Sequence, residues 1–174
     1  MIPIGTNLTE GTTGEHTWQK ARPWNMDGSV SNMADDNKVT MQEFFINKKV
    51  VVFGIPAPFT GVCTEEHFPG YRDMAAQFKQ KGVDSIVCYS VADPYALYNW
   101  AKAMNNNFDD IICLADLDAS WAKEHNLDRD YADCSLGTRA DRFSMIVENG
   151  LVKSFQIVDD AKNDAKAVLA QLID

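Results

Sequence analysis

The chain has 174 residues, of which 45% are hydrophobic and 24% charged, a composition typical of a single globular domain with a sizeable core. Its 16 basic and 25 acidic residues give a formal charge of −9, which argues against a nucleic-acid partner because phosphate backbones attract basic surfaces. No apolar run approaches the roughly 20 residues of a membrane span, and the N-terminus lacks the features of a secretory signal, so we expect a cytoplasmic protein that does not contact membranes.

Residues 1–38 form the first of two regions that the sequence distinguishes. They are rich in Thr, Gly, Asn and Asp and show little periodicity, which predicts an extended, loop-rich arm with a short hairpin around HTWQKA. Trp18 and Trp24 indicate that this arm packs on the body, because exposed tryptophan is uncommon. The composition leaves open whether the arm is a structural hairpin or docks a partner. Residues 39–174 form the body of what we expect to be a single domain.

The body begins with a short helix and a buried strand. Thr40 and Glu43 can form a capping box, in which each side chain satisfies a free backbone N–H at the helix start. KVVVFG, residues 49–54, is a near-continuous β-branched run, typical of a strand that is buried on both faces. Residues 64–81 carry apolar side chains at helical spacing, and we expect Pro69 to bend this helix.

The second half of the chain alternates strands and helices and ends in a hairpin. Asp93 and Pro94 suit the N-cap and first residue of a helix, and RFSMIVENGLVKSFQIV predicts a hairpin with an Asn-Gly turn of type I′. This order predicts an α/β protein of thioredoxin-like architecture, with a central mixed sheet and helices on both faces. The other predicted elements are strands at 83–91 and 111–116 and helices at 119–125 and 161–173.

Cys63 lies where the strand at 49–54 passes through a proline-containing loop into the N-terminus of a helix. Unpaired N–H groups and the helix dipole favour a thiolate there, and a thiolate is the reactive form of the side chain. A buried packing cysteine is the alternative, because free cysteine is among the most buried residue types. Glu65 and Glu66 would repel a thiolate, so a cation is needed from elsewhere. Arg142, at the start of a strand, is the candidate, unless it is simply solvated.

A resemblance to a known family strengthens the reactive interpretation. Pro56, Thr60 and Cys63 have the PxxxTxxC spacing of the active-site motif of peroxiredoxins, which are thiol peroxidases with a thioredoxin-like fold. GIPAPFTGVCTEEHFPGY resembles more narrowly the type-five (redoxin) branch of that family. The similarity continues through ICLAD to DRFSMIVENGLV and so covers residues 39–158, most of the chain.

The resemblance implies a role for each matching residue. Cys63 would be the peroxidatic cysteine, whose thiolate attacks a peroxide oxygen and becomes a sulfenic acid. Thr60 would hold the peroxide oxygens in line, and Pro56 would shield the sulfenic acid from water. Arg142 would pair with the thiolate and the peroxide, which answers the objection from the two glutamates. The family also implies a homodimer, hydrogen peroxide and small organic hydroperoxides as substrates, and no requirement for a metal or an organic cofactor.

The remaining cysteines decide how the sulfenic acid would be reduced. Some members of the family have a resolving cysteine in the C-terminal segment, but here no cysteine follows Cys134. Cys88 and Cys113 lie within predicted strands, where we expect packing residues, which leaves Cys134 as the one internal candidate. The sequence therefore predicts a one-cysteine mechanism with an external thiol as reductant, first glutathione with a glutaredoxin and second thioredoxin. Pro58 and Gly61 depart from the branch pattern, which leaves the preferred peroxide open.

Two rival functions remain open at this stage. His67, one helical turn after Cys63, could form a Cys–His pair for acyl transfer, although the matching histidine of the family implies structural or dimer-interface hydrogen bonding. A thioredoxin-fold redox-sensing or binding protein is the second rival. It would need Cys63, but it would not need Thr60 or Arg142 for rapid reaction with peroxide.

Overall fold

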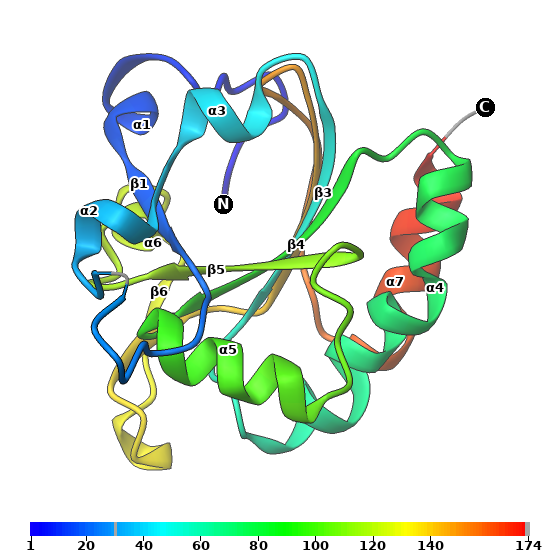
Figure 1. The fold of residues 1–174 in the computed structure, drawn as a ribbon. Coiled ribbons are helices and arrows are strands. Elements are labelled where there is room, and N and C mark those ends of the chain that lie inside the picture. Colours follow the sequence, from blue (N-terminus) through cyan, green and yellow to red (C-terminus); the bar gives the residue numbers. More distant parts are fainter. Residues whose placement is uncertain (30, 173–174) are drawn as a thin grey trace.

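The computed structural model describes residues 1–29 and 31–172. Within these residues, seven strands form one mixed sheet: β1 (Thr17–Lys20), β2 (Lys38–Thr40), β3 (Lys49–Ile55), β4 (Ser85–Val91), β5 (Ile111–Asp116), β8 (Phe143–Glu148) and β9 (Leu151–Ile157). Their order across the sheet is β2-β1-β5-β4-β3-β8-β9 (Figure 1). β4 is parallel to β3 and β5, and the other neighbours are antiparallel. The predicted α/β fold with a central mixed sheet is confirmed.

Helices cover both faces of this sheet, as expected. Those of the described residues are α1 (Gly11–Glu15), α2 (Ala34–Asn37), α3 (Met41–Phe45), α4 (Phe68–Gln80), α5 (Pro94–Ala103), α6 (Ser120–Glu124) and α7 (Ala161–Gln171). One face packs against α4, α5 and α7, and the other against α3 and α6. Figure 1 shows α4 and α7 side by side to the right of the sheet, with α3 and α6 to its left.

β3 lies in the interior of the sheet, between β4 and β8, and its side chains alternate between the two cores. Val51 and Phe53 join the core under α4 and α7, whereas Val50 and Val52 join the other. At the end of the strand, Gly54 is in register with Phe143 of β8, and a Cβ atom on Gly54 would come within 2.2 Å of the Phe143 ring. The absence of a side chain on this glycine therefore lets β3 and β8 approach closely.

The N-terminal arm departs from its prediction. No local hairpin forms around residues 16–21, because β1 is inserted into the sheet between β2 and β5 and pairs with both. Trp18 explains this position, since its ring is fully buried among those of Phe45, Tyr89 and Trp121. Trp24 differs: its side chain is 53% exposed, although its ring contacts Tyr95.

The first residues of the arm also contact the sheet, at its other end. The N–H of Gly5 donates to the carbonyl of Val152, whose own N–H donates to the carbonyl of Thr6. The N–H of Leu8 donates to the carbonyl of Gly150. Residues 5–8 thus run along the open edge of β9, where that strand begins.

Most of the local signals in the body are confirmed. Thr40 and Glu43 form the capping box of α3, and Asp93 caps α5 through its side chain. Asn149 and Gly150 have φ angles of 47° and 81°, as a type I′ turn requires. The predicted helix at 161–173 is observed as α7, and residue 173 lies outside the described residues.

In two places the observed elements of the body differ from the predicted ones. The segment at 64–81 is not one bent helix, because a wider π-helical turn (Cys63–His67) precedes the regular helix α4. A small separate sheet of β6 (Asp128–Asp130) and β7 (Thr138–Ala140) also follows α6. Its strands have three residues each, too few to show a period in the sequence.

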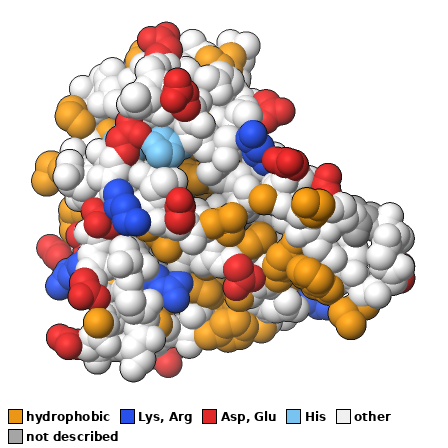
Figure 2. All heavy atoms as spheres, turned by 90° about the vertical axis from the view of Figure 1, so that its left-hand side faces the viewer, with side chains coloured by type: hydrophobic (Ala, Val, Ile, Leu, Met, Phe, Trp, Pro, Cys, Tyr) orange, Lys and Arg blue, Asp and Glu red, His pale blue; other side chains and the backbone are white. Residues whose placement is uncertain are grey.

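The surface agrees with the charge of −9. On the face that carries α1 and α2, acidic side chains are scattered over the whole area and basic ones are fewer, while hydrophobic side chains gather towards the lower right (Figure 2). In the described part of the chain, no helix has the length and apolar character needed to span a bilayer.

Candidate active site

Cys63 lies at the first position of the π-helical turn, directly after the loop that leaves β3. Its side chain is almost completely buried, with 2% of its surface exposed. The N–H of Phe68 donates to the carbonyl of Cys63, five residues earlier, which widens the turn. Glu65 and Glu66 are exposed on the outer side of this turn, where water screens their charges. The charges of the two glutamates are therefore screened and do not rule out a thiolate at Cys63.

Thr60 and Pro56 lie in the loop between β3 and this turn. The hydroxyl of Thr60 donates to the carbonyl of Ala57 at 2.8 Å, and the carbonyl of Thr60 accepts from the N–H of Thr64 at 3.0 Å. These bonds fix the loop and leave the Thr60 oxygen able to accept another hydrogen bond. Pro56 is buried and lines a pocket of about 260 Å³.

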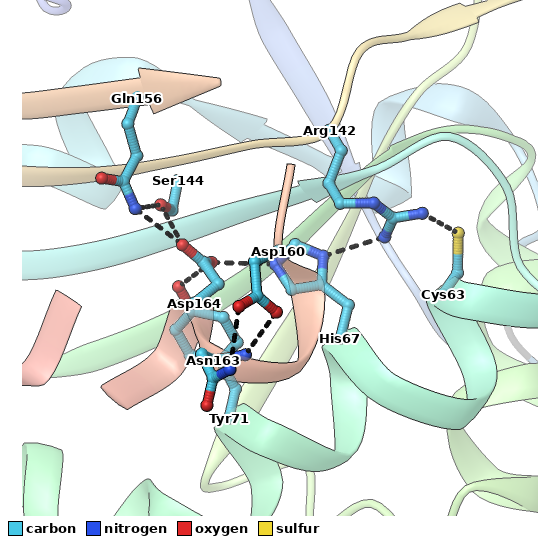
Figure 3. A network of polar contacts seen from close by, with 9 residues as sticks. All are labelled: Cys63, His67, Tyr71, Arg142, Ser144, Gln156, Asp160, Asn163 and Asp164. Carbon is cyan, nitrogen blue, oxygen red and sulfur yellow. Dashed lines mark hydrogen bonds and ion pairs between the residues drawn. The ribbon is translucent and has the colours of Figure 1, made fainter. Parts of the chain in front are cut away.

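Arg142, the residue just before β8, supplies the missing cation. One terminal nitrogen of its guanidinium donates to Sγ of Cys63 at 3.3 Å, and the other lies 3.1 Å from Nδ1 of His67 (Figure 3). Arg142 is therefore not a solvated strand-end residue. It also lines the pocket beside Pro56, together with Tyr131.

Asp164 of α7 completes a network that the sequence did not predict (Figure 3). Its side chain is buried, and one of its oxygens accepts from Nε2 of His67 at 2.9 Å and from the hydroxyl of Tyr71 at 2.6 Å. The other oxygen accepts from the hydroxyl of Ser144 and the amide of Gln156, both at 2.8 Å. No sequence signal singled out this aspartate, because an acid in the first turn of a helix is the usual complement to the dipole.

The protonation of this network follows from its donors and its burial. Burial alone would raise the pKa of Asp164, but the hydrogen bonds from His67 and Tyr71 outweigh it and lower that pKa. Burial lowers the pKa of His67, and Asp164 offsets this only in part. A guanidinium can only donate, so Nδ1 of His67 must accept and the ring proton must be on Nε2. His67 is thus a neutral ring between Arg142 and an ionised Asp164.

This arrangement bears on the acyl-transfer alternative. A Cys–His pair needs a ring nitrogen that can take the thiol proton. His67 directs Nδ1 to Arg142 and Nε2 to Asp164, so neither nitrogen is directed to Cys63. The sulfur instead contacts a permanent cation, which favours a thiolate without a general base.

The other cysteines are placed as packing residues, with one exception. Cys88 of β4 and Cys113 of β5 are buried side by side in register, and burial raises the pKa of Cys88 well above its usual range. Cys134 is exposed in a 3₁₀ turn (Ala132–Cys134) between β6 and β7. All four cysteines are free thiols.

Comparisons with known proteins agree with this geometry. The family model described as Redoxin matches residues 20–172. The chain is 38% identical to Peroxiredoxin-2F, mitochondrial, of Arabidopsis thaliana, over 97% of this chain and 81% of the relative. It is 39% identical to the protein of that name from Oryza sativa subsp. japonica, over 99% and 83%. Among solved structures, reduced Prx3 of Vibrio vulnificus in complex with hydrogen peroxide has a TM-score of 0.80 and 34% identity, with 99% and 96% covered.

Proposed function

Because this chain belongs to the Redoxin family and is a peroxiredoxin, a thiol-dependent peroxidase, we propose that Cys63 is its peroxidatic cysteine and that it works by a one-cysteine mechanism. The observation that carries this proposal is the 3.3 Å contact between Arg142 and Sγ of Cys63. It provides the cation that a thiolate needs at this position, where the pattern of the loop alone left the reactivity of Cys63 open.

The first half-reaction follows from the groups around the sulfur. The Cys63 thiolate attacks one peroxide oxygen, a bond forms between sulfur and oxygen, and the O–O bond breaks. The leaving oxygen carries the electron pair, takes up a proton and departs as water or an alcohol, which leaves Cys63 as a sulfenic acid. The Arg142 guanidinium stabilises the negative charge as it moves from sulfur to oxygen, and the Thr60 oxygen accepts a hydrogen bond from the peroxide. Pro56 limits access of water to the sulfenic acid.

The second half-reaction uses an external thiol. This thiol attacks the sulfenic acid sulfur to give a mixed disulfide and water, and a second thiol then releases Cys63 in its reduced form. Two thiols are thereby oxidised for each peroxide reduced. The burial of Cys88 and Cys113 supports an external reductant, with glutathione and a glutaredoxin as our first choice and thioredoxin as our second.

Hydrogen peroxide and small organic hydroperoxides are the substrates that we propose, because the resemblance implies them and because the similar structure of reduced Prx3 from Vibrio vulnificus is a complex with hydrogen peroxide. The type-five branch, a homodimer and a cytoplasmic location stay predictions from the sequence. The two plant relatives are named as mitochondrial proteins.

The proposal is tested by trapping the sulfenic acid. The reduced protein is mixed with a sub-stoichiometric pulse of hydrogen peroxide in the presence of dimedone, and its intact mass is measured. We expect a near-quantitative dimedone adduct on Cys63 within seconds, and no adduct in Cys63→Ser. Rapid loss of two hydrogens instead would indicate an internal disulfide and overturn the one-cysteine mechanism, with Cys134→Ser as the variant that identifies the partner.

The same assay separates a peroxidase from a redox sensor. In a peroxidase, Thr60→Val and Arg142→Ala each slow the oxidation of Cys63 by orders of magnitude, because both groups act on the reacting oxygens. In a sensor that oxidises slowly, neither variant changes the rate much. Slow oxidation of the wild-type protein, with adduct formation only at a large excess of peroxide, would contradict the peroxidase.

A further inference from the structure

Asp164 has more hydrogen-bond donors than a purely structural acid in a helix would need. It is 3% exposed, and it accepts four hydrogen bonds, two on each oxygen. The donors come from four elements: His67 from the π-helical turn, Tyr71 from α4, Ser144 from β8 and Gln156 from β9. All of them can donate to the carboxylate without any proton on Asp164, so the site is built for the ionised form.

The network leads from Asp164 to the sulfur through three successive contacts. Asp164 accepts from Nε2 of His67 at 2.9 Å, Nδ1 of His67 faces Arg142 at 3.1 Å, and Arg142 donates to Cys63 at 3.3 Å. Each contact constrains the next. If the ring proton moved from Nε2 to Nδ1, it would point at a guanidinium that has no acceptor, and Arg142 would lose a partner that fixes its orientation.

From this geometry we propose that Asp164 is a positioning residue of the peroxide reaction: by holding the proton of His67 on Nε2, it orients Arg142 toward the Cys63 sulfur. The inference rests on the proposed role of Cys63 as the peroxidatic cysteine. It makes the C-terminal helix α7 part of the active site, although α7 contributes no group that touches the peroxide. The lowered pKa values of Asp164 and His67 agree with an ionised acid and a neutral ring.

The test measures the rate at which hydrogen peroxide oxidises Cys63, in single-turnover experiments from pH 5 to pH 9. The variant is Asp164→Asn, which keeps the size of the side chain but can hold either tautomer of His67. We expect the rate to fall about tenfold or more, the scale on which outer hydrogen-bond partners affect the groups they orient. The midpoint of the pH–rate profile should also move to higher pH, because a displaced guanidinium stabilises the thiolate less.

Several charged or titratable groups near the sulfur of Cys63 contribute to the pH–rate profile. Arg142 reaches the sulfur from the position just before β8, His67 belongs to the same turn as Cys63, and Cys88 of β4 is close enough to interact with the charge of the thiolate. Glu65 and Glu66 lie on the exposed side of that turn. None of these groups is altered in Asp164→Asn, so a shifted midpoint reports the change at Asp164.

Asp160→Asn is the matched control. Asp160 precedes α7 and caps it through Asn163, is exposed, and carries the same charge as Asp164. Because asparagine caps a helix as well as aspartate does, this variant removes the charge without loss of the cap, and the oxidation rate should stay at the wild-type value.

A double-mutant cycle tests whether Asp164 acts through His67. If it does, Asp164→Asn has little further effect in a His67→Asn background, so the double variant reacts as slowly as His67→Asn alone. A long-range ¹H–¹⁵N spectrum gives an independent readout of the ring: the Nε2–H tautomer in the wild-type protein and a mixture of tautomers in Asp164→Asn.

Several outcomes would overturn the proposal. An oxidation rate and pH profile of Asp164→Asn equal to those of the wild type would do so, as would additive effects at the two positions. Should Asp164→Asn fail to fold, His67→Asn decides: without the link to Asp164 its amide can turn either its oxygen or its NH2 group to Arg142, so we expect slow oxidation, and a wild-type rate would contradict the proposal. Slow oxidation of Cys63 in the wild-type protein would refute the proposed function and with it this inference. Rapid oxidation of Cys63 in both the wild-type protein and Asp164→Asn would refute the inference alone.

Discussion

Among the described residues, two histidine–carboxylate pairs lie in contrasting settings, one buried and one partly exposed. The side chains of His67 and Asp164 are completely buried, whereas those of His16 and Glu124 are 19% and 26% exposed. The exposed pair joins the N-terminal arm to α6, since Thr12 and Thr13 also donate to Glu124, at 2.8 and 2.7 Å. The buried pair joins α7 to the active-site turn.

The two pairs differ in what burial does to their protons. At Glu124, burial alone would raise the pKa, but the hydroxyls of Thr13 and Thr12 and the ring of His16 outweigh it and bring the pKa from 4.5 to about 2. At His67, burial has the largest effect and lowers the pKa. The same two chemical groups therefore make a surface link in one place and a fixed tautomer in the other. What distinguishes the pair of His67 and Asp164 is its complete burial and the presence of Arg142 on the far side of the ring.

The largest difference between the two pairs is expected in their contributions to the free energy of unfolding. Asp164→Ala leaves four donors without their acceptor, three of them buried, and each buried group left unsatisfied costs about 1–3 kcal/mol, so we expect a loss of about 3 kcal/mol or more. Glu124→Ala removes a partly exposed acceptor and should cost about 1 kcal/mol or less. Urea unfolding at pH 7 measures both. Equal losses of unfolding free energy for the two variants would show that burial does not distinguish the pairs.

The next contrast is in the reaction rate. Arg142→Lys retains the charge, but a single ammonium group cannot reproduce the fork that reaches both Nδ1 of His67 and the sulfur of Cys63. We expect the oxidation of Cys63 by peroxide to slow by about 10²-fold, comparable with the loss of one donor to a developing oxyanion. His16→Gln, which alters the exposed pair, should leave the rate unchanged. A wild-type rate in Arg142→Lys would mean that charge alone suffices.

The pairs should also lose stability in different ranges of pH. Folding lowers the pKa of His67. Below pH 6.5, the ordinary pKa of histidine, the unfolded chain takes up a proton that the folded chain does not, so the free energy of unfolding decreases as the pH is lowered. The contribution of Glu124 is present above 4.5 and is lost as the pH falls to about 2. We expect the difference in unfolding free energy between wild type and His67→Asn to shrink first, below about pH 6.5. The difference for Glu124→Gln should shrink only below 4.5.

The smallest effect is that of salt on the exposed pair. Glu124→Gln should destabilise the protein by about 1 kcal/mol or less at low ionic strength, and this difference should decline in 1 M NaCl, where the screening length is about 3 Å. The loss caused by Asp164→Ala should stay nearly constant over the same range. Unfolding curves at two salt concentrations are sufficient, and a strong salt dependence at Asp164 would show that water reaches the buried pair.

The residues around Cys63 show how much of the candidate active site could be predicted from the sequence. Cys63, Thr60 and Pro56 lie within eight consecutive residues, so their spacing alone could indicate a site. Arg142 is distant along the chain: its place at the start of a strand made it a candidate cation, and only the resemblance of the RFSM motif to a family pattern gave it a role beside Cys63. The structure brings its guanidinium to the sulfur. The catalytic roles of these four residues stay predictions until they are measured.

The role of Asp164 and the position of β1 in the sheet could not be predicted from the sequence. The partners His67 and Asp164 are 97 residues apart, and an acid at the start of a helix is common whether it is buried or exposed. β1 is only four residues long, and it joins the sheet because Trp18 fills a space between aromatic rings of three other elements. Both features depend on contacts between distant segments. Local signals, such as the capping box and the Asn-Gly turn, were predicted correctly because their physics lies within a few residues.

The pairing of residues 5–8 with β9 has a consequence for how copies of this protein behave in a crowded solution. β9 is the last strand of the sheet, and an open strand edge offers N–H and C=O groups that can recruit a strand from another molecule. Thr6 and Gly5 already occupy both backbone groups of Val152, and Lys153 places a charge next to them. Residues 5–8 thus occupy the backbone groups that a strand from another molecule would need, so we expect them to prevent pairing between sheets where β9 begins.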